Sequence, residues 1–108
     1  MIARTWGASA TIDGAAAYQR HFESSVLVEL ARVPGYLGAF LLCHEESGRV
    51  RLTVLSLWNS TDAIRRFAGQ EYETAVVHDD AKAVLDDYDT VVRHHSVAVA
   101  APAPGGPE

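Results

Sequence analysis

The segment from Leu52 to Ser60 constrains the fold more than any other, because it predicts a strand that is apolar on both faces and runs directly into a helix cap. Alternation along a strand places Val54 and Trp58 on one face and Leu55 and Leu57 on the other. A chain of 108 residues with few predicted helices cannot cover both faces of such a sheet. The sequence therefore predicts a sheet that packs on a second copy of itself, in a homodimer.

The composition is that of one globular domain, with 48% hydrophobic residues. The net charge is -5 and no basic cluster could neutralise phosphates, so we expect no nucleic-acid partner. No apolar run approaches the roughly 20 residues that span a bilayer, and the first residues lack a signal-peptide pattern. We therefore expect no membrane contact and a cytoplasmic location. The single cysteine, Cys43, excludes an internal disulfide, and its place within a strand predicts a small buried side chain.

Hydrophobic periodicity and turn residues predict the order strand, helix, strand, strand, helix, strand. The predicted ranges are a strand over Ile2–Ala8, a helix capped by Asp13 and stopped at Pro34-Gly35, strands over Tyr36–Glu45 and Arg49–Trp58 around a 46–48 loop, a helix from Asn59 or Ser60 to Gly69, short helical pieces over Glu71–Val77 and Asp79–Leu85, and a strand over Tyr88–Val99. This order is the ferredoxin-like split βαβ arrangement, an α+β fold with a four-stranded antiparallel sheet and helices on one face. The domain is expected to span residues 1–98, followed by a flexible Ala/Pro/Gly tail over 99–108.

Three segments carry a family resemblance: Trp58-Asn59-Ser60-Thr61-Asp62-Ala63, Phe67-Ala68-Gly69 and Tyr72-Glu73-Thr74-Ala75-Val76-Val77. Together with Pro34-Gly35-Tyr36, they resemble the Trp-x-Ser-x-x-Ala, Phe, Tyr pattern of the antibiotic biosynthesis monooxygenase superfamily, over residues 1–97. The resemblance implies a dimeric α+β barrel, in which the sheets of two subunits pair and each subunit keeps a pocket between sheet and helices. Its members include cofactor-free quinone-forming oxygenases and haem-degrading enzymes.

The sequence departs from both branches of this family. Trp58 matches the tryptophan that lines the pocket of the cofactor-free oxygenases, but Val54 and Ile64 stand where those enzymes have asparagine and tyrosine. In the haem-degrading branch the iron-ligating histidine falls near Val76, two residues before His78. A haem site would need His78 to shift by half a helical turn. We therefore favour the cofactor-free interpretation and expect no cofactor and no metal.

His94 and Arg4 are the candidate catalytic residues. A neutral imidazole at His94 could take a proton from a phenol or enol near pH 7, and Arg4 on the neighbouring strand could hold the oxyanion. His94 and His95 are adjacent on a strand, so only one of them can face the pocket. The candidate substrate-binding residues would stack on a small aromatic or polyketide-like ligand: Trp58, Trp6, Tyr72 and Phe22.

The other histidines are predicted to be structural or solvated. His21 lies at the edge of the first helix's apolar face, and the pairs His44-Glu45 and His78-Asp79 lack the spacing of metal ligands. No flavin, nicotinamide or phosphate-loop fingerprint occurs in the chain.

These features favour a cofactor-independent monooxygenase of aromatic or polyketide secondary metabolism. A non-catalytic dimeric barrel that binds a small ligand, or a cyclase or isomerase on the same fold, stays open, and a haem-degrading oxygenase is less favoured.

Overall fold

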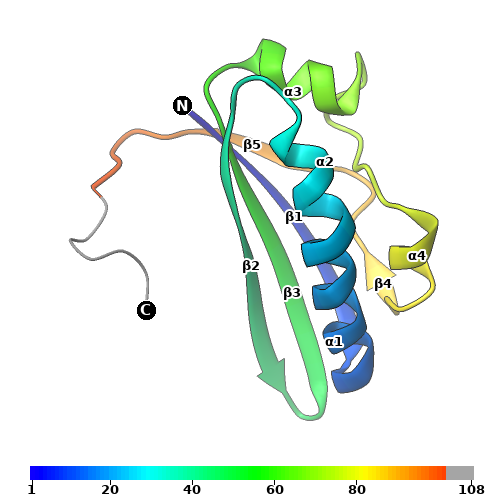
Figure 1. Cartoon of the computed structure of the whole chain (residues 1–108). Helices are drawn as coiled ribbons and strands as arrows, with labels where there is room; N and C mark the ends of the chain where they lie inside the picture. Colours follow the sequence, from blue (N-terminus) through cyan, green and yellow to red (C-terminus); the bar gives the residue numbers. More distant parts are fainter. Residues whose placement is uncertain (102–108) are drawn as a thin grey trace.

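The computed structural model describes residues 1–101 and is built on one antiparallel sheet. The strand order is β2-β3-β1-β4, and β5 also pairs with β1. The strands are β1 (Ile2–Thr11), β2 (Tyr36–Glu46), β3 (Arg49–Trp58), β4 (Asp87–Tyr88) and β5 (Arg93–Ser96). Figure 1 shows one long helical rod crossing one face of the sheet, while the other face has no helix over it. This is the predicted α+β, ferredoxin-like fold, with the two short strands in the place of the predicted last strand.

The helical rod consists of α1 (Ile12–His21), a π-helical turn η1 (Phe22–Val26) and α2 (Leu27–Ala31). Its N-cap is Thr11, whose hydroxyl accepts a hydrogen bond from the Gly14 amide at 3.0 Å. The prediction of Asp13 as the cap was wrong, because β1 runs three residues further than expected and delivers a threonine to the turn. The rod ends before Gly35, whose φ of 95° suits glycine and turns the chain into β2.

The β2–β3 hairpin and helix α3 (Thr61–Ala68) confirm predictions that rest on local chemistry. Ser47 and Gly48 have φ values of 52° and 78°, so the connection is a tight turn of these two residues rather than the expected three-residue loop. The Ser60 hydroxyl caps α3 by accepting from the Ala63 amide at 3.1 Å, and α3 ends at Gly69.

The C-terminal third differs from the prediction. The segment 71–77 is not helical, because its backbone pairs with the segment that follows β4: the Ala75 amide donates to Thr90 at 2.9 Å, and the Val92 amide donates to Glu73 at 2.8 Å. This pairing breaks the predicted strand 88–99. Tyr88 pairs with Ala8 and Arg93 pairs with Thr5. Between these two pairs the last segment has two residues more than β1, so it bulges outward. Helix α4 (Asp79–Lys82) is shorter than expected.

The two faces of the sheet differ in their cover. The inner face packs against the helices and carries Leu52 and Trp58, both fully buried. On the outer face Phe40 is 46% exposed and Leu42 49% exposed. The prediction of a buried Cys43 was wrong: Cys43 is exposed, because it lies on the edge strand β2. Residues 102–108 of the proposed tail lie outside the described part of the chain. Within residues 1–101, the last strand or helix ends at Ser96.

Candidate functional site

A cavity of about 60 Å³ lies between the inner face of the sheet and the helical rod. Its walls come from β1, β3, the rod and the segment 76–81. Most of the lining is apolar, and the charged or titratable side chains in it are Arg4, Tyr18, His21, Glu29 and His78. Burial raises the pKa of Tyr18 to about 12, so this residue stays a neutral phenol at pH 7. The space holds roughly four water molecules or part of a small ligand.

Arg4 is a buried cation in the wall of this cavity, with only 5% of its surface exposed. Its guanidinium donates to the backbone carbonyls of Tyr72 and Thr74, the latter at 3.3 Å, and lies 5.8 Å from the centre of the Phe67 ring. These partners are all uncharged. Burial accordingly lowers the pKa of Arg4 from 12.5 to about 10. A buried cation without a carboxylate favours an anionic ligand, because the anion would offset the cost of desolvation.

His94 lies on β5 beside Arg4, with 3.0 Å between its Nε2 and Arg4 Nη1. Because a guanidinium only donates, Nε2 is the acceptor and the ring proton is on Nδ1. Burial, and then the charge of Arg4, lower the pKa of His94, so the ring is neutral at pH 7. Its basic nitrogen is already engaged, and His94 is not among the residues that line the cavity. The geometry makes His94 a residue that positions Arg4.

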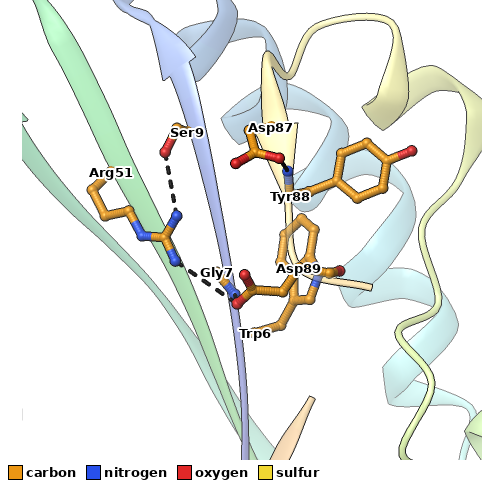
Figure 2. A network of polar contacts seen from close by, with 7 residues as sticks. All are labelled: Trp6, Gly7, Ser9, Arg51, Asp87, Tyr88 and Asp89. Carbon is orange, nitrogen blue, oxygen red and sulfur yellow. Dashed lines mark hydrogen bonds and ion pairs between the residues drawn. The ribbon is translucent and has the colours of Figure 1, made fainter. Parts of the chain in front are cut away.

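Trp6 lies in the cavity wall, as the sequence predicts, and a polar network holds its indole. The indole Nε1 donates to the Asp89 carbonyl at 2.8 Å, and the Asp89 carboxylate accepts from the Gly7 amide at 3.1 Å. The guanidinium of Arg51 donates to the Ser9 hydroxyl at 3.2 Å and lies 3.8 Å from the Asp89 carboxylate. Figure 2 shows Arg51 between these two side chains. The outward bulge of the last segment therefore fixes the orientation of Trp6.

The other three predicted aromatic residues do not line the cavity. Trp58 has no exposed surface, donates to the Ser56 hydroxyl at 2.9 Å and stacks on Phe67 with 5.7 Å between ring centres. Phe22 is 4% exposed and packs in the core under the rod. Tyr72 packs against the His94 ring, with 5.4 Å between ring centres. Trp58 and Phe22 are core residues of this subunit, and Tyr72 supports the Arg4–His94 pair.

Sequence reasoning missed a cluster of three polar side chains in the cavity wall. His78 Nε2 lies 2.9 Å from the Glu29 carboxylate, and His78 Nδ1 lies 3.3 Å from His21 Nε2. His21 and Glu29 lie eight residues apart, about 80° from each other around a regular α-helix, and His78 is distant from both in the sequence, so no periodicity signal pointed to the cluster.

Searches with the sequence gave no relative: no family model and no curated protein matches it. Solved structures do match. The cofactor-independent oxygenase SnoaB from Streptomyces nogalater is 13% identical with a TM-score of 0.54, and the match covers 94% of this chain and 98% of SnoaB. A protein from Bacillus cereus, assigned only provisionally to the antibiotic biosynthesis monooxygenases, is 16% identical with a TM-score of 0.60 over 93% of this chain and 97% of that chain.

The chain has the fold of the antibiotic biosynthesis monooxygenases. A mutant of MhuD, solved with two manganese protoporphyrin IX molecules per active site, shares this antibiotic biosynthesis monooxygenase fold at a TM-score of 0.61 and 18% identity. That match covers 95% of this chain and all of the MhuD chain. In the described part of this chain, residues 1–101, no helix is long and apolar enough to cross a membrane.

The cavity does not fit a haem, the group that the resemblance to haem-degrading enzymes would imply. Both ring nitrogens of His78 already have partners, Glu29 and His21, so neither is free to ligate iron. The volume of about 60 Å³ is far below the roughly 300 Å³ of pockets that enclose drug-sized ligands, and a porphyrin is larger than most of these.

Proposed function

We propose that this protein is a cofactor-independent monooxygenase that acts on an ionisable aromatic compound, a phenol or enol of polyketide-like secondary metabolism, in the cytoplasm. The observation that carries the proposal is the buried guanidinium of Arg4 in the wall of an apolar cavity. All the hydrogen-bond partners of this guanidinium are uncharged. The fold shared with SnoaB supports the same chemistry.

The proposed reaction uses the substrate anion as its own source of electrons. Loss of the phenolic O–H proton leaves the electron pair on oxygen, and the charge of Arg4 in the cavity wall stabilises this anion. In the enol tautomer that loses this proton, the CH₂ carbon of the ketone has become a conjugated CH, so the anion delocalises onto this carbon, which forms a C–O bond with O₂. The resulting peroxide takes up a proton and becomes a hydroperoxide. Loss of water then gives a quinone carbonyl. The carbon loses four electrons, and O₂ supplies the oxygen of the carbonyl and that of the water.

The cavity would receive an outer ring that bears a hydroxyl group, because its volume of about 60 Å³ excludes a polycyclic molecule as a whole. Trp6 provides the flat wall for this ring, and its indole is held in place through Asp89. The remainder of the substrate would extend toward solvent along the segment 76–78.

We also propose that the protein is a homodimer, formed by the outer faces of two sheets. Leu37, Phe40 and Leu42 on this side of β2 are each about half exposed, and Leu55 and Leu57 of β3 lie beside them. An obligate interface of this kind buries on the order of 2,000 Å² or more.

Oxygen uptake with a dihydroxyanthrone in chelator-treated buffer tests the proposed activity. We expect the wild-type protein to consume O₂ and form the quinone, and Arg4→Met to lower kcat by about 10²-fold, the usual effect of losing one oxyanion donor. Arg49→Met is the matched control, because Arg49 is exposed and pairs with Asp86 away from the cavity. Binding of the anthrone without O₂ uptake would instead support the alternative of a ligand-binding protein.

A further inference from the structure

Three side chains from separate parts of the chain meet in the cavity wall opposite the sheet: His21 of α1, Glu29 of α2 and His78 before α4. Glu29 accepts a hydrogen bond from His78 Nε2 at 2.9 Å. This contact fixes the proton of a neutral His78 on Nε2 and leaves Nδ1 as the basic atom, facing His21 Nε2 at 3.3 Å. The His21 and His78 rings meet edge to face, with 5.2 Å between their centres.

The π-turn η1 brings His21 and Glu29 to the same face of the rod. Each residue turns an α-helix by about 100°, so residues eight apart lie about 80° from each other around the axis. A π-turn holds one more residue than an α-turn, so it reduces the angle between the two residues by roughly this amount. The five residues of η1 lie between His21 and Glu29, so the irregular turn is what allows both to reach His78. Such turns often occur at functional sites.

We propose that Glu29, His78 and His21 form the proton acceptor of the cavity, with His78 as the base. This assignment rests on the proposed function, since it names the group that ionises the substrate held by Arg4. The O–H bond of the ligand breaks and its electron pair stays on oxygen. The proton reaches His78 Nδ1 through the His21 ring, which takes it up at Nδ1 and passes on its own Nε2 proton. The Glu29 carboxylate then stabilises the imidazolium.

The surroundings of His78 suit this role. The His78 side chain is 33% exposed and that of Glu29 44% exposed, so the imidazolium can return its proton to solvent between turnovers. The other charged groups near it do not compete for the proton. Asp79 and Lys82 on the same segment lie 3.8 Å from each other, and Arg4 lies in the sheet wall of the same cavity. Tyr18, which packs against His21, stays neutral because burial raises its pKa to about 12.

The test separates ionisation from oxidation by excluding O₂. The probe is 4-nitrophenol, whose phenolate absorbs visible light, added below its own pKa. Calorimetry in buffers of different ionisation enthalpy counts the protons released. We expect the wild-type protein to bind the phenolate without proton release, because His78 keeps the proton. In His78→Asn and Glu29→Gln the bound probe should stay neutral, or ionise only with release of its proton to the buffer.

Two exposed residues supply the matched controls. His44→Asn changes a histidine whose ion-pair partner is the exposed Glu46, and Glu23→Gln changes a glutamate of the rod that bonds only Gln19 among the described residues. Both should behave as the wild type, and circular dichroism should show all variants folded. Phenolate bound to His78→Asn without proton release, as in the wild type, would overturn the proposed base, as would a wild-type protein that does not bind the probe.

The two proposals fail in different ways. Phenolate binding without proton release, but no O₂ uptake with any anthrone, would leave the proton acceptor standing and refute the oxygenase. Unchanged oxygenase turnover in both Glu29→Gln and His78→Asn would refute the proton acceptor and leave the oxygenase standing. A true base predicts a loss of about 10²- to 10⁴-fold in turnover.

Discussion

Replacing Phe40 by aspartate should convert the proposed dimer into a folded monomer. Phe40 lies on the outer face of β2, opposite Leu55 of β3, and 46% of its surface is exposed in the single subunit. With about 200 Å² for the whole side chain, a partner sheet would cover roughly 90 Å², worth about 2 kcal/mol. In a two-fold symmetric dimer Phe40 occurs twice in the interface, so the binding free energy falls by roughly 4 kcal/mol. The dimer dissociation constant rises by about 10³-fold.

Sedimentation equilibrium at micromolar concentration measures this shift directly. Val28→Asp is the matched control, because Val28 is 45% exposed but lies on α2, on the opposite side of the sheet from the proposed interface. We expect the control to stay dimeric and the Phe40 variant to be monomeric with an unchanged far-ultraviolet spectrum. A wild-type protein that is monomeric at this concentration, or a Phe40 variant that dimerises as tightly as the wild type, would refute the reasoning.

Three further predictions concern the subunit itself. Trp58→Ala should cost about 3 to 5 kcal/mol of unfolding free energy in a denaturant titration, because Trp58 is fully buried, while ligand affinity per folded molecule should change little. Gly14→Ala should cost about 1 to 3 kcal/mol in the same titration, because a Cβ there would overlap the backbone carbonyl oxygen of Val84 and push α1 from its place. The lowered pKa of His94 means that the folded protein binds its proton less readily than the unfolded chain. Stability from this residue is therefore present above pH 6.5 and falls as the pH drops below it; His94→Asn should flatten that part of the melting-temperature profile.

The parts of the fold that local chemistry determines were predictable from the sequence. The Ser60 cap of α3 and the stop at Gly35 each depend on a few neighbouring residues and lie where expected, and the turn at Ser47-Gly48 falls within the expected 46–48 loop. The last strand was not predictable. Its break at 89–92 follows from pairing with residues 73–75, and neither segment carries a signal of that contact.

The candidate site divides in the same way. Arg4 and Trp6 were named from the sequence as a cation and an aromatic residue of the first strand, and alternation along β1 places both in the cavity wall. His94 was correctly placed beside Arg4, but which of its nitrogens is engaged depends on side-chain geometry that no pattern encodes. The cluster of His21, Glu29 and His78 depends on a π-turn and on a contact between distant segments.

The place of β2 at the end of the strand order has a consequence for how the chain avoids aggregation while it folds. A terminal strand presents unpaired backbone amides and carbonyls to any other extended chain. Here the apolar residues Phe40 and Leu42 are followed, after Cys43, by His44, Glu45 and Glu46, and the register with β3 shifts between Tyr36 and Gly38. The register shift and the charges disfavour pairing between the β2 edges of two chains. The apolar outer face of β2 stays available for contact with a second sheet. We therefore expect the proposed dimer to form across the sheet face, and not along the edge strand, where backbone pairing could start a fibre.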